Sequence, residues 1–347
     1  MIIDRIVDVG LYVCAAFTVS FLDRLAPELL QEILEYLPLK DLMSFGRTSL
    51  RFRGWAAVMF KLRLSELFEP YHISYDLMRF VQISTGSGLS GSIIAYLALY
   101  LRRDPDAFVP GDLDIYVPTS SWDAVIAFFT TLAGYATYKE RTSSYGNATS
   151  ITTVVWMRTH PLDPHTLNFM RCVDNNVYGP TVQFHSTCVV GCITANRAWF
   201  PTLDLTSQHI TILNRNFNVL STLEDRRRAL AIYRKWRARG FIIRFDYTRP
   251  HRCGRHSCCP STVRTSDDAY SYTLLMPLGN SSDSDAFEAT PDPACDVISW
   301  TFGGQGCANT RSGVQVRPYD VSCEYILCGH DLFTQYLTRR STMEGAS

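Results

Sequence analysis

The sequence predicts an α+β protein: a three-helix module, then a mixed α/β domain, then an irregular, cysteine-containing tail. Between residues 21 and 68, apolar residues recur at helical spacing and two prolines bound the first helix. From residue 75 to about 250, helical patterns alternate with β-branched strand patterns, as in α/β and α+β domains. Beyond residue 250 these patterns weaken. A length of 347 residues fits about two domains with extensions.

Composition limits the classes of partner. The chain has 33 basic and 33 acidic residues and a formal net charge of zero, so no overall field attracts nucleic acid or an anionic membrane. Its 46% apolar content is typical of a folded chain rather than a disordered one. Its 11 irregularly spaced cysteines predict reduced thiols and a cytoplasmic or nuclear location. We therefore expect protein partners, without a membrane or nucleic-acid partner.

Residues 1–20 form an apolar leader segment that superficially resembles a signal peptide. Asp4 and Asp8 interrupt its basic and apolar regions. The apolar run is also too short and too interrupted to cross a bilayer. We expect a buried helix or strand here, with a signal anchor as the alternative.

The module at residues 21–68 has clear helix boundaries. Pro27 suits the first turn of a helix, where its missing N–H costs nothing, and Glu28 is favourable beside the helix dipole. An apolar stripe at i, i+3, i+4 and i+7 follows, made of Leu30, Ile33, Leu34 and Leu37. Pro38 ends this helix, because a residue before proline avoids the α region. "LKDLMSFG" and "SLRFRGWAAVMFKLRL" predict two more helices, which need one another because short helices are unstable alone.

The order "LAPELLQEILEYLPLKDL", followed by an arginine-rich segment with Trp55, closely resembles the F-box. Arg47 and Thr48 stand where that family usually has valine and cysteine. The resemblance implies docking to the Skp subunit of a Skp–cullin–F-box ubiquitin ligase, in keeping with helix-in-groove recognition. The implied partner-binding residues are Leu25, Pro27, Glu28, Leu30, Ile33, Leu34, Leu37, Pro38 and Leu42. The alternative is that this stripe is ordinary core of a larger helical domain.

In the second module, "GSGLSGSIIAYLALYL" predicts a glycine-serine loop that opens an apolar helix, a geometry suited to a phosphate. "VPGDLDIYVP" predicts a strand that directs Asp112 and Asp114 to one face. A helix in "SSWDAVIAFFTTLAGY" and strands in "YATYKE", "SITTVVWM", "HTLNFMRCV" and "CVVGCITA" follow.

A Gly-Ser pair before a strand with two alternating aspartates resembles the nucleotidyltransferase fold. The resemblance implies that Gly91 and Ser92 hold a triphosphate, while Asp112 and Asp114 bind magnesium with a third carboxylate from a neighbouring strand. "HTLNFMRCVDNN" carries no carboxylate within the strand, and only Asp174, past its end, is available. We therefore expect a degenerate domain. Residues 84–260, with "VQFHSTCVVGCITANRAWFPT" and "RARGF", also resemble a group of uncharacterised fungal proteins, which implies no established reaction.

Two further segments have both a functional and a structural interpretation. In "QFHSTC", His185 is a candidate base for Ser186 or Cys188. Residues so close in one extended segment rarely reach catalytic geometry, so we favour a buried histidine. The helix "EDRRRALAIYRKWRARG" is a candidate contact for RNA or an acidic partner, and we favour a solvated face on a packed helix.

The tail, residues 251–347, concentrates soft metal ligands near its start. Cys253, His256, Cys258 and Cys259 are candidates for a structural zinc site, although their spacing is irregular, and reduced cysteines packed in loops are the favoured alternative. The acidic, Ser- and Pro-rich segment near residues 279–294 predicts a flexible loop. "DVISWTF" predicts a strand, and "EYILCGHDLFTQYL" predicts a strand and a helix.

The leading hypothesis is a non-catalytic adaptor that docks the Skp subunit and presents its second domain to an unknown protein substrate, without a cofactor. The alternative is a metal-dependent nucleotidyltransferase that uses Gly91, Ser92, Asp112 and Asp114, with magnesium and a nucleotide. RNA binding through the arginine-rich helix is a third hypothesis.

Overall fold

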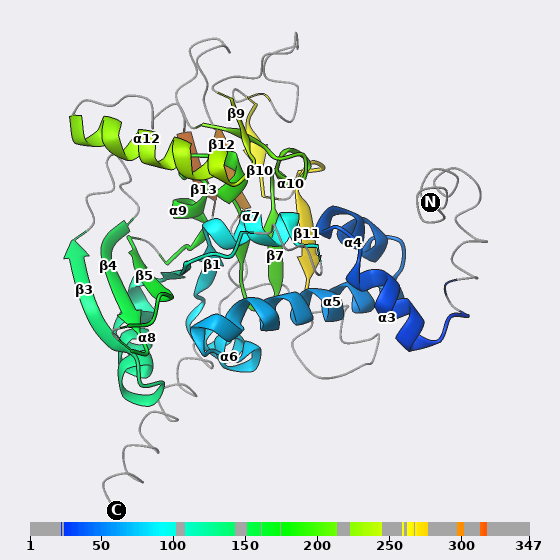
Figure 1. The fold of residues 1–347 in the computed structure, drawn as a ribbon, viewed down its shortest axis with the longest axis horizontal. Helices are drawn as coiled ribbons and strands as arrows, with labels where there is room; N and C mark the ends of the chain where they lie inside the picture. Colours follow the sequence, from blue (N-terminus) through cyan, green and yellow to red (C-terminus); the bar gives the residue numbers. More distant parts are fainter. Residues whose placement is uncertain are drawn as a thin grey trace, which may run out of the picture.

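The computed structural model describes residues 22, 24–101, 108–142, 151–160, 162–173, 175–213, 223–244, 259, 262–266, 268–276, 297–301 and 313–317. Several predictions concern residues outside these ranges. They are the leader, Asp174, the acidic segment at 279–294, "EYILCGHDLFTQYL", and the zinc candidates Cys253, His256 and Cys258. The described part is a mixed α/β structure with helices from the N-terminal region at one end (Figure 1).

The predicted N-terminal helical trio is confirmed as α3 (Pro27–Glu35), α4 (Leu39–Gly46) and α5 (Leu50–Phe68). Pro27 stands in the first turn of α3, and Pro38 is the N-cap residue of α4. The Ser49 hydroxyl caps α5 by accepting a hydrogen bond from the Phe52 N–H. Gly46 allows α4 and α5 to approach closely, since a Cβ at this position would lie 2.9 Å from that of Ala56.

The mixed part follows α5 through a short 3₁₀ turn. Its elements up to residue 213 are η1 (Glu69–Tyr71), α6 (Tyr75–Thr85), β1 (Gly88–Ser90), α7 (Ser92–Leu99), β2 (Asp112–Val117), η2 (Thr119–Ser121), α8 (Trp122–Ala127), η3 (Phe128–Leu132), β3 (Ala136–Thr142), β4 (Ile151–Arg158), β5 (Thr166–Cys172), α9 (Tyr178–Thr181), η4 (Thr187–Val189), β6 (Cys192–Ile193), β7 (Arg197–Phe200), α10 (Leu203–Thr206) and β8 (Ile210–Ile212). After residue 222 come α12 (Leu223–Ala238), β9 (Ile242–Arg244), β10 (Arg264–Thr265), β11 (Tyr272–Leu275), β12 (Val297–Thr301) and β13 (Gly313–Arg317).

Among the described residues, eight strands form the main sheet, in the order β11-β7-β6-β1-β2-β5-β4-β3. Within it β2 and β5 run parallel, while the other neighbours are antiparallel. The tail contributes β11 to one edge of this sheet, and it forms the separate sheet β10-β12-β13. "DVISWTF" is thereby confirmed as a strand, whereas the position of β11 in the main sheet was not predicted.

Strand β2 divides its residues between two faces. Leu113, Ile115 and Val117 belong to the large hydrophobic core that includes the N-terminal helices. Asp112 and Asp114 lie on the opposite face, as their spacing predicts. Among the described residues, no helix combines the length and hydrophobicity needed to span a membrane.

The N-terminal helices share their core with the main sheet. Phe60 of α5 lies edge-on to Phe200 of β7, with ring centroids 6.1 Å apart. Polar contacts reinforce this packing, because Lys40 pairs with Asp204 at 2.7 Å and Arg47 donates to the Ser271 carbonyl at 2.9 Å. The core is therefore continuous across the boundary predicted between the first two modules.

Candidate functional site

Helix α3 has a buried face and an exposed apolar face. Leu30 and Leu34 are each 1% exposed and lie in the core. Leu29, Ile33 and Tyr36 are 53%, 47% and 48% exposed. Their spacing of i, i+4 and i+7 places the latter three on one side of the helix, and we call them the α3 stripe.

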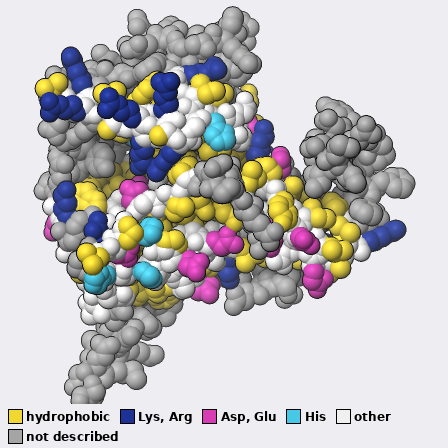
Figure 2. Space-filling view, in the orientation of Figure 1, with side chains coloured by type: hydrophobic (Ala, Val, Ile, Leu, Met, Phe, Trp, Pro, Cys, Tyr) yellow, Lys and Arg dark blue, Asp and Glu magenta, His cyan; other side chains and the backbone are white. Residues whose placement is uncertain are grey.

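The predicted partner-binding residues fall into three groups. Leu30, Leu34 and Leu42 are in the core, where a partner reaches them only if a helix moves. Leu25, Leu37 and Pro38 are half-buried, and Pro27, Glu28 and Ile33 are exposed. Sequence reasoning missed Leu29 and Tyr36, although they form a second apolar row beside the first. Figure 2 shows hydrophobic side chains gathered over these helices, with acidic side chains among them.

A second candidate site surrounds the two aspartates of β2. Gly91, at φ +82°, precedes α7 and packs directly against Asp114, since a Cβ at residue 91 would lie 2.1 Å from Asp114 Oδ2. Ser92 donates its hydroxyl to Asp112 Oδ1 at 3.4 Å. The structure thus brings together all four residues predicted for a phosphate and metal site.

Asn168 completes this cluster from the neighbouring strand. The parallel register of β2 and β5 sets Asn168 beside Asp114. Its side-chain amide donates to Asp114 Oδ1 at 2.8 Å and to Asp112 Oδ2 at 3.2 Å. A neutral donor therefore joins the two carboxyl groups on the strand for which the nucleotidyltransferase resemblance implies a third carboxylate.

Charge in this cluster is only partly balanced. Burial, followed by the charge of Asp112, raises the pKa of Asp114 to about 8, while the Asn168 hydrogen bond and Lys235 oppose the rise. Arg239, which follows α12, has its pKa lowered by burial, and the negative charge of Asp112 opposes this. Two basic residues of the predicted arginine-rich helix region therefore act on the aspartates.

These residues do not match the donor set of a two-metal centre. The Asn168 amide N–H, rather than an oxygen, faces both carboxylates. Within the described ranges, no group of three or more His, Cys, Asp and Glu side chains is placed to hold a metal ion. We derive no catalytic step from the cluster, and the nucleotidyltransferase alternative stays a prediction.

In "QFHSTC", Ser186 and Cys188 are buried and His185 is half-buried. His185 Nδ1 lies 2.6 Å from Ser186 Oγ, which lies 3.7 Å from Cys188 Sγ. Burial raises the pKa of the Cys188 thiol to about 12 and lowers that of His185 to about 3. A protonated thiol beside a neutral imidazole is a poor nucleophile, so this geometry favours packing over catalysis. Cys259, the zinc candidate that lies among the described residues, is buried.

Comparison with known protein families gives a match near the N-terminus. The F-box domain model matches residues 22–57, which include α3, α4 and the first part of α5. The chain carries an F-box domain. F-box domains typically bind the Skp subunit of cullin-based ubiquitin ligases, so the match supports a role in protein interaction. Neither the curated proteins nor the solved structures gave a match to this chain.

Proposed function

We propose that this protein is the substrate-recruiting adaptor of a Skp–cullin–F-box ubiquitin ligase. Its F-box helices dock the Skp subunit, and the remaining α/β structure recruits a protein for ubiquitylation. The observation that carries this proposal is the exposed α3 stripe within the matched F-box domain.

The stripe suits recognition of a helix by an apolar groove. Its three side chains point away from the core, while Leu30 and Leu34 hold α3 from the other side. A fully buried aliphatic or aromatic side chain contributes roughly 1.5–3 kcal/mol, so burying the exposed half of each stripe residue contributes about 1 kcal/mol. Anchors on a fixed helix also lose little entropy when they bind.

The shared core supports the second half of the adaptor role. The Phe60–Phe200 packing holds the F-box helices against β7, and the Lys40–Asp204 ion pair holds them against α10. A substrate bound to the α/β structure is therefore held at a fixed position relative to a docked Skp subunit. A fixed geometry favours transfer of ubiquitin to the substrate, because it raises the effective concentration of substrate at the ligase.

Binding of the purified full chain to a purified Skp subunit tests the proposal. We expect Ile33→Asp to raise the dissociation constant measured by calorimetry at least tenfold, since it places a charge in the apolar interface. The matched control is Ile83→Asp on α6, because Ile83 is 46% exposed and lies outside the F-box domain. This control should bind like the wild type. Unchanged affinity in a folded Ile33→Asp variant would refute the proposed docking.

A further inference from the structure

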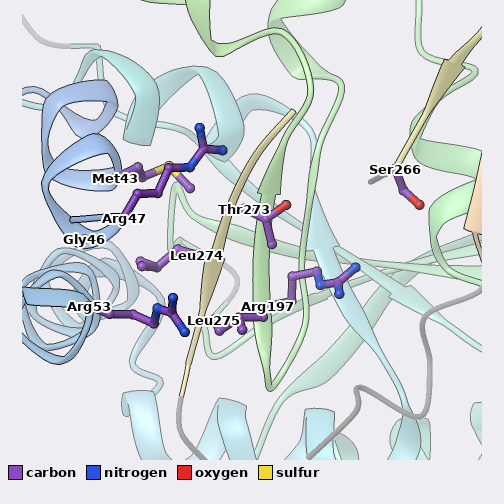
Figure 3. A pocket seen from close by; sticks show the side chains of 9 residues that line it. All are labelled: Met43, Gly46, Arg47, Arg53, Arg197, Ser266, Thr273, Leu274 and Leu275. Atoms are coloured by element: carbon purple, nitrogen blue, oxygen red, sulfur yellow. The ribbon is translucent and has the colours of Figure 1, made fainter. Parts of the chain in front are cut away.

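A pocket of about 320 Å³ lies between the F-box helices and the edge of the main sheet. Three arginines from different elements line it: Arg47 follows α4, Arg53 is in α5 and Arg197 is in β7. The hydroxyls of Ser266 and Thr273 add hydrogen-bonding groups to the lining. Figure 3 shows how these side chains surround β11.

The charged side chains that line the pocket are all positive. The lining contains three guanidinium groups and no carboxylate among the described residues that form it. Two aspartates near this end of the sheet already have cationic partners, since Asp204 pairs with Lys40 and Asp268 pairs with Arg264. The charges of Arg47 and Arg53 on the F-box side of the pocket therefore favour a ligand that supplies negative charge.

The pocket follows the outer strand of the sheet. Among the described residues, β11 is an edge strand that pairs with β7 on one side. In Figure 3, Arg47 and Arg53 lie on one side of β11, and Arg197 and Ser266 lie on the other. An extended chain beside β11 would direct alternate side chains toward these two sides.

Arg47 is held in place for recognition. Its guanidinium donates to the Ser271 carbonyl at 2.9 Å and lies 4.9 Å from the centroid of the Tyr272 ring. These contacts orient a planar group that offers five N–H donors in all. A fixed guanidinium binds a carboxylate or phosphate with two parallel hydrogen bonds at a low entropic cost.

We propose that this pocket binds an extended peptide segment with anionic side chains, carboxylate or phosphate, in the protein that the adaptor recruits. The proposal rests on the adaptor function and names the chemistry of its substrate. A peptide satisfies both features of the site, because it supplies negative charge and has the backbone groups to lie beside an edge strand.

Fluorescence polarisation with the full chain and labelled nine-residue peptides tests this proposal. One peptide alternates glutamate with serine, a second replaces glutamate with phosphoserine, and a third replaces it with glutamine. We expect one or both anionic peptides to bind, with affinity that falls as salt rises, and the glutamine peptide to bind at least tenfold more weakly. Stronger binding of the phosphoserine peptide assigns phosphate as the preferred group, and stronger binding of the glutamate peptide assigns carboxylate.

Two variants locate the binding. Arg47→Gln/Arg53→Gln removes two charges on the F-box side of β11, and Thr273→Glu adds a negative charge from the strand itself. Each variant should bind the anionic peptide at least tenfold more weakly than the wild type does. The control Arg234→Gln/Arg237→Gln removes the same charge from exposed positions of α12 and should leave affinity within about twofold. If the double variant does not fold, Thr273→Glu alone tests whether the peptide binds in this pocket.

Equal binding of all three peptides, or equal losses in the pocket and α12 variants, would overturn the proposal. Binding of inorganic phosphate or an RNA oligonucleotide without either anionic peptide would also overturn it. Skp binding is measured on the same samples. If the wild-type chain binds the Skp subunit but neither anionic peptide, the pocket proposal alone is rejected. If it binds an anionic peptide but not the Skp subunit, the adaptor function alone is rejected.

Discussion

At the scale of single residues, Asn168 determines the character of the aspartate cluster. Its amide donates to both Asp112 and Asp114, so it supplies positive hydrogen-bonding groups between two carboxylates. A carboxylate at the same position would repel Asp112, and also Asp114 wherever that group is ionised, unless a cation lay between the three groups. The residue type at position 168 therefore determines whether these side chains form a hydrogen-bonded cluster or a cation site.

We expect Asn168→Asp to create divalent-cation dependence. Without metal the variant should melt at a lower temperature than the wild type, because it loses two hydrogen bonds and brings a third carboxyl group to the cluster. Addition of Mn²⁺ should raise its melting temperature by several degrees and leave the wild type within about one degree. Differential scanning fluorimetry measures both values. The control Asn168→Leu loses the same hydrogen bonds without adding a carboxylate, so an equal Mn²⁺ response in both variants would contradict the explanation.

The raised pKa of Asp114 predicts a pH dependence of stability. The pKa is about 8 in the folded protein, and an unperturbed aspartate has a value of about 3.9. Between about pH 4 and pH 8 the folded state therefore binds more protons than the unfolded state, and the free energy of unfolding falls as pH rises. Asp114→Asn removes this contribution, so its free energy of unfolding should decline less from pH 5 to pH 8.

Urea denaturation at pH 5, 6.5 and 8 measures this difference. The amide introduced by Asp114→Asn retains an oxygen that can accept the Asn168 hydrogen bond, which limits other effects of the change. The matched control is Asp123→Asn at an exposed position of α8, which should follow the wild-type curve. Parallel declines in the wild type and Asp114→Asn would contradict the assigned pKa.

At the scale of elements, helix boundaries were readable from the sequence and contact partners were not. Pro27 and Pro38 act locally, so they predicted the start of α3 and its separation from α4, although α3 ends at Glu35 rather than at Leu37. Leu29 and Leu30 belong to two adjacent apolar rows of α3, and only packing against α5 selects the row that becomes buried. Asn168 is 54 residues from Asp114 in the sequence, and its role depends on the β2–β5 register, which no local pattern specifies.

The two faces of α3 should respond differently to truncation. Leu34→Ala leaves a cavity in the core and should lower the free energy of unfolding by about 2–5 kcal/mol. Leu29→Ala removes a side chain that is 53% exposed, so it should change stability by no more than about 0.5 kcal/mol while weakening Skp binding. Chemical denaturation and calorimetry separate the two effects. Equal destabilisation by both changes would show that the assigned faces are wrong.

At the scale of the whole molecule, the F-box helices and the main sheet form one packing unit. Their buried residues belong to one hydrophobic cluster that extends from Leu30 of α3 to Leu274 of β11. Removal of the helices would expose the apolar side chains of the sheet that they cover. Under the proposed adaptor function, this shared core would hold a bound substrate at a fixed position relative to the Skp subunit.

Phe60→Ala should therefore destabilise both parts together. Phe60 is fully buried against Phe200, so its truncation should lower the free energy of unfolding by about 3–5 kcal/mol. In native-state hydrogen exchange, the slowest amides of α4 and β7 should report the same opening free energy in the wild type, and both should fall by the same amount in the variant, because a shared core opens as one cooperative unit. Val58→Ala, on the exposed side of α5, is the control and should change neither value by more than about 0.5 kcal/mol. A loss of protection confined to α4 would show instead that the F-box helices unfold independently of the sheet.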